Sequence, residues 1–237
     1  MKTTKRIIIG LLAALTVLSA SLATATAANE LYGESRLSTV SSSNEGFVNA
    51  AGDTSTGGVG IALGYELGMV DQIALRPLLM YDVQGFDGWR FDGDLRTRWG
   101  RQQLMVGADV GYDIFTWLRP MARLAMGYSH QSLTFTAGGQ DYRDTAHGMS
   151  GLVAGGLEAS IGRSPMGTDP ISRLSLGANM LFGYTFQTEA HFDEMTSVDA
   201  PEEPTDEDPW RRATYDADTI QASGFAFSFG VSLRYRF

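Results

Sequence analysis

The most constraining feature of this chain is the strict alternation of side-chain type over its last thirteen residues, FAFSFGVSLRYRF. Every odd position from Phe225 to Phe237 is aromatic or aliphatic, and every even position between them is small or cationic. Successive side chains of an extended chain point to opposite faces, so a period of two indicates a β-strand with one wholly apolar face. An aromatic residue at the last position favours a strand whose apolar face meets lipid.

Seven further segments alternate in the same way, although the first of them has only a thinly apolar face. No segment after residue 28 holds 18 consecutive apolar residues, so a membrane location of the mature chain requires strands rather than helices. The sequence therefore predicts an all-β fold. The predicted strands are residues 30–40, 57–68, 72–83, 102–115, 117–130, 148–162, 171–187 and 225–237.

The connections between these segments alternate strictly between short and long. This asymmetry is typical of an outer-membrane barrel, in which both termini and the short turns lie on the periplasmic side and the long loops face outward. We therefore predict an eight-stranded antiparallel up-and-down transmembrane β-barrel. The long, outward loops of this prediction lie near residues 41–56, 84–101, 131–147 and 188–219.

The aromatic residues of the predicted strands support this topology. If the odd strands run outward, the aromatics form two girdles, one at each edge of the apolar band. From Trp117 to Tyr128 a tilted strand covers about 28 Å, close to the thickness of that band. The periplasmic girdle holds Tyr65, Tyr112, Trp117, Tyr235 and Phe237, and the outer girdle holds Tyr81, Tyr128, Tyr184, Phe186 and Phe225.

Residues 1–28 have the organisation of a secretory signal peptide: a basic start, an apolar run over residues 7–18 and small residues near a cleavage site. The mature chain, residues 29–237, is then a single barrel domain with 15 cationic and 27 acidic side chains, a net charge of 15 minus 27, or −12. Such an acidic exported chain is not expected to bind nucleic acid. The absence of cysteine excludes disulfides and thiolate chemistry.

With its eight strands, its alternating connections and its terminal Leu233, Tyr235 and Phe237, the chain resembles the small eight-stranded outer-membrane barrels. These are the outer-membrane protein A transmembrane domains and their X-type and Ail-type relatives. The resemblance implies a place in the cell outer membrane of a Gram-negative bacterium, among outer-membrane lipid and lipopolysaccharide. It also implies that the three terminal residues are an insertion signal read by the barrel-assembly machinery.

The same resemblance implies a role without enzymatic activity, with no cofactor and no metal. That role would be structural or adhesin-like: membrane integrity, surface adhesion or resistance to host or environmental factors, with any extracellular ligand bound by the outward loops. The residues leave the choice among these roles open.

The inward faces of the predicted strands carry charges of both signs in nearly equal number. Eight strands enclose a space that side chains can fill, and buried charges must be paired, so we predict an ion-pair network that closes the lumen. The alternatives are a narrow pore or proton path, a diffusion porin, and a soluble lipocalin-type barrel with its apolar face inward. The predicted network comprises Arg36, Arg76, Arg119, Arg123, Arg173, Arg234 and Arg236 with Glu34, Glu66, Asp82, Asp109, Asp113 and Glu158.

One constellation offers an enzymatic alternative. His130 and Ser132 lie on the same, lipid-facing side of one predicted strand, and Asp144 follows in the next predicted loop. A His-x-Ser pair beside an acid resembles the catalytic set of the lipid A 3-O-deacylase barrels, which would make the chain a lipid A-modifying enzyme. That family has Asn after the Ser, near its C-terminus, whereas here Leu133 follows in mid-chain. We therefore predict no catalytic residues.

The last long loop is strongly acidic: residues 193–208 hold eight carboxylates, two prolines and no base. This composition predicts a solvated, mobile loop. Clustered carboxylates are also hard oxygen ligands, so binding of calcium or of a cationic partner is the alternative, although no EF-hand spacing is present. Trp210, Arg211 and Arg212 could fold this loop back onto lipid headgroups or another loop.

Overall fold

A computed structural model describes residues 30–44, 47–48, 54–70, 72–90, 95–137, 140–161, 174–192 and 219–236. The predicted signal peptide, the acidic segment 193–208, Trp210 and Phe237 lie outside these residues. None of the described residues belongs to a helix that could cross a membrane. The strands are β1 (Glu30–Ser42), β2 (Ser55–Val70), β3 (Ile73–Arg90), β4 (Leu95–Tyr112), β5 (Leu118–Ala137), β6 (Gln140–Ile161), β7 (Leu174–Gln187), β8 (Ala190–His191), β9 (Thr219–Ile220) and β10 (Gly224–Arg236).

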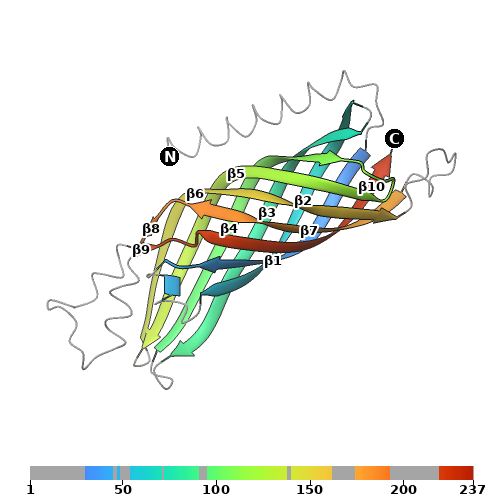
Figure 1. Ribbon diagram of the computed structural model, residues 1–237. Helices are drawn as coiled ribbons and strands as arrows, with labels where there is room; N and C mark the ends of the chain where they lie inside the picture. The colour runs from blue at the N-terminus through green and yellow to red at the C-terminus, as the bar shows by residue number, and fades with distance from the viewer. Residues whose placement is uncertain are drawn as a thin grey trace.

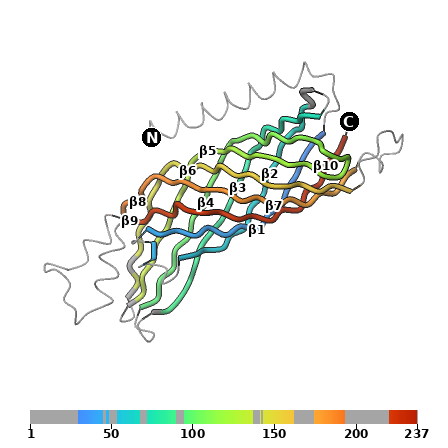
Figure 2. Tube along the Cα trace, viewed as in Figure 1, coloured from blue at the N-terminus to red at the C-terminus, as the bar shows by residue number. Residues whose placement is uncertain are grey.

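Eight of these strands close into one antiparallel barrel, in the order β1-β10-β7-β6-β5-β4-β3-β2 (Figure 1). The first and last strands pair along their whole length, from Glu30 opposite Arg236 to Ser42 opposite Gly224. The tube trace shows the two, blue and red, side by side (Figure 2). The predicted eight-stranded up-and-down barrel is therefore confirmed. The short strands β8 and β9 pair separately.

The barrel wall is much taller on one side than on the other. Strands β3, β4, β5 and β6 have 18, 18, 20 and 22 residues, whereas β1, β7 and β10 have 13, 14 and 13. At a tilt of about 40°, a strand as long as β5 spans roughly 48 Å, against an apolar band of about 25 Å. The excess extends past the end of the barrel that is remote from residues 30 and 236, which we call the distal end (Figure 1).

Two predicted loops are therefore wrong in their extent. Most of residues 84–101 and 131–147 continues β3 to β6 as paired strand, with Phe86 opposite Trp99 and Leu133 opposite Asp144. We call this part of the wall the distal projection; it consists of residues 84–90, 95–101, 131–137 and 140–147.

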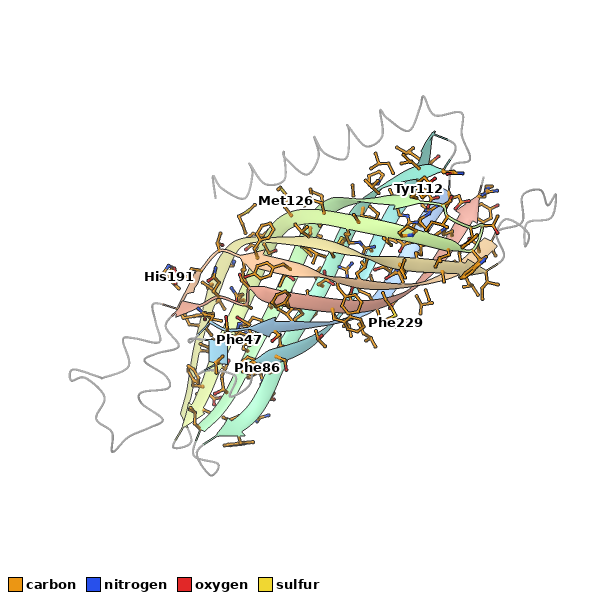
Figure 3. The ribbon with its side chains drawn as sticks, viewed as in Figure 1. Phe47, Phe86, Tyr112, Met126, His191 and Phe229 are labelled. Carbon is orange, nitrogen blue, oxygen red and sulfur yellow. The ribbon has the colours of Figure 1, made fainter. Side chains whose placement is uncertain are left out.

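We call the rest of the barrel wall, below the distal projection, the spanning part. Its outer surface is an apolar belt. Leu63, Leu124, Phe182 and Leu176 are each 58–60% exposed, and every strand of the barrel contributes such residues. Met126 and Phe229 lie on this surface, whereas Phe47 and Phe86 lie near the distal end (Figure 3). The described members of the predicted girdles also lie on the outside, and Tyr112, Trp117, Tyr81, Tyr128, Tyr184, Phe186 and Phe225 are exposed.

The polarity of the wall reverses along β5. In the spanning part its inward side chains include Arg123 and its outward ones include Leu124. In the distal projection the inward residues are Leu133 and Phe135, both buried, and the outward residue between them is Thr134. The same strand thus faces lipid outward at one height and packs an apolar core inward at another.

One glycine of the wall lies beneath an aromatic ring. Gly151 of β6 pairs with Phe186 of β7, and a Cβ at this glycine would lie 1.9 Å from Cζ of that ring. The ring therefore occupies the space of the missing side chain, as in aromatic rescue of glycine in sheets.

Candidate functional site

The chemistry-bearing side chains of the described strands gather in the lumen. In the spanning part the inward positions carry arginines and carboxylates that are at most 4% exposed, so solvent does not screen their charges. The members of this interior network are Arg36, Arg76, Arg119, Arg123 and Arg234 with Glu34, Glu66, Asp82, Asp109 and Glu158.

Arg123 of β5 is at the centre of the network. Its Nη1 and Nη2 donate to Oε1 and Oε2 of Glu34 at 3.0 and 2.8 Å. Its Nε and Nη2 donate to Oδ1 and Oδ2 of Asp109 at 2.7 and 2.9 Å. Two bidentate contacts of this kind satisfy the guanidinium fork on both sides and hold β1, β4 and β5 together across the lumen.

Arg76 of β3 joins the next carboxylates. Its Nη2 donates to Glu66 Oε2 at 2.7 Å and to Glu158 Oε2 at 3.1 Å, and its Nη1 donates to Asp109 Oδ2 at 3.3 Å. Its guanidinium also lies 3.8 Å from the centroid of the Tyr32 ring, a cation–π contact inside the barrel.

The network continues to the rim at which β1 begins. Arg119 donates to Glu66 from Nη1 and Nη2 at 2.8 and 2.9 Å, and its Nε donates to Asp113 Oδ1 at 2.7 Å. At the rim itself Arg236 Nε donates to Glu30 Oε1 at 3.0 Å. These contacts link β1, β2, β5 and β10.

Most of the predicted members of the network form ion pairs inside the lumen. Arg234 forms ion pairs with Glu158 and, at 4.0 Å, with Glu66. Arg236 pairs with Glu30, which is not among the predicted members of the network. Tyr32 was also missed, although Glu30 and Tyr32 share the period-two face of Glu34. Arg173 lies outside the described residues.

Above the charged layer the lumen changes character. Arg101 is fully buried, and among the described residues no carboxylate lies within hydrogen-bonding distance of it. Its Nη1 donates to Gln187 Oε1 at 2.8 Å and to the Ala222 carbonyl at 3.1 Å. Its Nη2 donates to Gln84 Oε1. This amide layer separates the ion pairs from the apolar residues beyond it.

The distal end of the lumen is filled by an apolar cluster, which we call the distal core. The Trp99 ring lies 5.6 Å from the rings of both Phe47 and Phe86, and its Nε1 donates to Gln131 Oε1 at 3.0 Å. Phe47 comes from the connection after β1, and its side chain packs into the barrel mouth. The distal core comprises Phe47, Leu95, Trp99, Leu133, Phe135, Ala146, Ala190, Phe192, Ile220 and Ala222.

The described side chains thus occupy the lumen at successive levels. A gap among Arg76, Asp109, Arg119 and Glu158 has no room for a water molecule. The charges of these four side chains are therefore stabilised by direct ion pairs rather than by water.

The outer face of the distal projection is polar. Arg96 donates from Nε and Nη2 to the two carboxylate oxygens of Asp87, each at 2.8 Å, and Arg98 Nε donates to Asp87 Oδ2 at 3.1 Å. The hydrogen bonds from Arg96, with those from Arg98, lower the pKa of the Asp87 carboxyl. Trp89, 60% exposed, lies beside Arg96.

The three residues of the enzymatic alternative are not brought together. His130 pairs in register with His147 and Ser132 with Thr145, on the outer face. Asp144 lies opposite Leu133 and so belongs to the other face of β6; its Oδ1 accepts from the Thr145 amide at 2.6 Å. The acid therefore does not orient the imidazole of His130, whose Nδ1 lies 3.2 Å from Nδ1 of His147.

A closed antiparallel barrel with an apolar outer belt, aromatic edges and a charged lumen is stable only where lipid surrounds the belt. These features define the class of the molecule: it is an outer-membrane β-barrel protein. The terminal Leu233 and Tyr235 lie on the lipid side of β10, and their reading by the barrel-assembly machinery stays a prediction.

Comparison with known proteins gives fold-level likeness. No protein-family model matches the sequence, and no curated protein matches it. The structure is similar to that of Neisserial surface protein A, with 13% identity, a TM-score of 0.46 and coverage of 88% of this chain and 97% of that one. For the attachment invasion locus protein of Yersinia pestis the identity is 11% and the TM-score 0.39, with coverage of 89% of this chain and 97% of that one. For a major outer membrane protein from Thermus thermophilus the identity is 12% and the TM-score 0.44, with coverage of 88% of this chain and 99% of that one.

Proposed function

We propose that this protein is a non-enzymatic outer-membrane barrel with a closed lumen, which holds the distal projection outside the cell as a surface for interaction. The observation that carries the proposal is the reversal of polarity at the distal end. An apolar core inside a polar wall is the construction of a water-exposed domain, so this part is built to stand in water beyond the lipid.

The lumen supports a structural role rather than transport. Ion pairs fill the spanning part, an amide layer follows, and the distal core covers the mouth. We expect the mature protein in planar bilayers to give no steady, well-resolved channels, and such channels would contradict the closed lumen. Removal of the core by Trp99→Ala together with Phe135→Ala, with the ion pairs intact, serves as a matched control and leaves the bilayer silent.

The direction of insertion can be tested because the chain has no cysteine. Thr136→Cys places a thiol on the outer face of the distal projection, and Ile114→Cys places one at the opposite end of the barrel, where the side chain is 51% exposed. In intact cells a membrane-impermeant maleimide should label only Thr136→Cys. Labelling of Ile114→Cys alone would invert the proposed topology.

Lipopolysaccharide is the partner that the charges on the projection favour. Among the described side chains, the arginines on the outer surface all lie in the distal projection: Arg96, Arg98 and Arg143. Guanidinium groups bind phosphate in a bidentate manner, and lipopolysaccharide is a phosphate-bearing molecule of the outer leaflet. The variant with all three arginines changed to Gln should retain less lipopolysaccharide on purification. Equal retention by this variant and the wild type would refute the assignment.

A further inference from the structure

Two of the chain's three histidines face each other on the outer surface of the barrel. His130 of β5 and His147 of β6 are direct register partners, with ring centroids 4.8 Å apart and ring planes inclined by 30°. Their Nδ1 atoms lie 3.2 Å apart. Two N–H groups pointing at each other over this distance would repel. At least one of the two Nδ1 atoms therefore carries no proton and offers a lone pair.

The spacing of these nitrogens suits a transition-metal ion. Zinc binds imidazole nitrogen at about 2.05 Å. Two such ligands separated by 3.2 Å subtend an angle of about 103° at the ion, close to the tetrahedral value. An ion bound by both Nδ1 atoms thus fits the distance between them, and it would replace the hydrogen bond between the Tyr128 hydroxyl and His147 Nδ1.

The next register pair adds ligands of suitable chemistry. Tyr128 and Met149 are partners two residues along, on the same outer face as the histidines. The Tyr128 hydroxyl hydrogen-bonds to Nδ1 of His147, and its ring stacks on the imidazole at 5.7 Å between centroids. Phenol oxygen and thioether sulfur beside two imidazoles suit zinc or copper rather than magnesium or calcium.

The surroundings leave the pair open to solvent. His147 and Tyr128 are exposed, and the described residues hold no group of three or more His, Cys, Asp or Glu side chains suited to a metal. Water would therefore complete the coordination, which gives an accessible binding site rather than a closed structural one. The charged side chains on the same face of β6 near the pair are Arg143 and Asp141.

We propose that His130 and His147, flanked by Tyr128 and Met149, bind one divalent transition-metal ion, zinc or copper, at the distal edge of the apolar belt. The site requires neither a closed lumen nor the absence of enzymatic activity. Its test is therefore independent of the test of the proposed function.

The test is a titration of the untagged mature protein, folded in detergent, with Zn²⁺ against a chelating dye at pH 7.5. The wild type should bind one equivalent, and His130→Gln and His147→Gln should each weaken binding at least tenfold. His191→Gln is the matched control, because it removes the third histidine and leaves the pair, and it should bind like the wild type. Heat-modifiable gel mobility verifies that every variant is folded.

Two further measurements identify the ligands. At pH 5, below the ordinary imidazole pKa of about 6.5, protonation of the pair should abolish binding. Bound Cu²⁺ should show coupling to two nitrogens by electron paramagnetic resonance, and to one nitrogen in either single variant. The proposal is overturned if the wild type takes up no zinc, if His191→Gln loses binding as the pair variants do, or if millimolar Ca²⁺ displaces the ion.

Discussion

Replacement of Arg123 by Met tests whether the interior network is a dry, mutually dependent set of charges. Arg123 is 1% exposed and is hydrogen-bonded to both carboxylate oxygens of Glu34 and of Asp109. Methionine fills much of the same volume but leaves these two buried carboxylates without their main cation. Removal of one partner from a buried ion pair costs about 3–5 kcal/mol.

The contacts that remain in the variant limit the loss in the free energy of unfolding. Glu34 keeps the Asn179 amide at 3.0 Å and Arg36 at 3.5 Å, and Asp109 keeps Arg76 at 3.3 Å. We therefore expect the free energy of unfolding to fall by about 3–5 kcal/mol, rather than by twice that amount for two carboxylates. The additional changes Glu34→Gln and Asp109→Asn remove the orphaned charges and should restore most of the loss.

The measurement is urea unfolding of the mature protein in phospholipid vesicles, read by heat-modifiable gel mobility and tryptophan fluorescence. Arg96→Met is the matched control, because Arg96 also makes a bidentate contact with an aspartate, Asp87, but on an exposed surface. That variant should unfold like the wild type. If Arg123→Met changes the free energy by less than about 1 kcal/mol, water reaches the interior charges and the closed lumen is refuted.

Three other changes test the wall. Trp99→Ala should cost the distal core about 3–5 kcal/mol and expose the projection to protease while the barrel still migrates as folded; an uncut projection would contradict the core's role. Leu63→Arg on the apolar belt should cost about 2–4 kcal/mol in vesicle unfolding, whereas Thr134→Arg should be neutral, and equal effects would misplace the belt. Gly151→Ala must displace the Phe186 ring and should lower the urea midpoint, unlike Gly155→Ala; an unchanged midpoint would mean that the ring moves freely.

The spanning strands could be predicted because lipid and lumen impose a period of two with a fixed sense. The outward series Leu124, Met126 and Tyr128 is apolar, and the inward series contains Arg123. The distal projection was mistaken for loop because water replaces lipid on its outer face. Residues such as Thr134 then face outward and Leu133 inward, so the alternation persists while its sense is reversed.

The partners inside the lumen could not be read from the sequence for a different reason. The inward face of each strand was evident, and so was its set of charges. Pairing across the lumen depends on the relative heights of strands, as with Arg123 and Glu34, which are 89 residues apart. The stagger of a closed barrel sets these heights, and no local pattern encodes it. The histidine pair could not be predicted for another reason: His147 lies in the predicted loop 131–147 and not in a predicted strand.

The distal projection sets a distance as well as a surface. From Tyr128 to Ala137, β5 rises about 23 Å at roughly 3.3 Å per residue and a tilt near 40°. Paired strands and a packed core hold this height fixed, so in the proposed orientation the tip would stand at one level in the carbohydrate layer of the cell surface. Short glycans would leave the tip uncovered, and long ones would bury it. The reach of a large partner, such as an antibody, would then depend on the length of the cell's own sugars as much as on the residues at the tip.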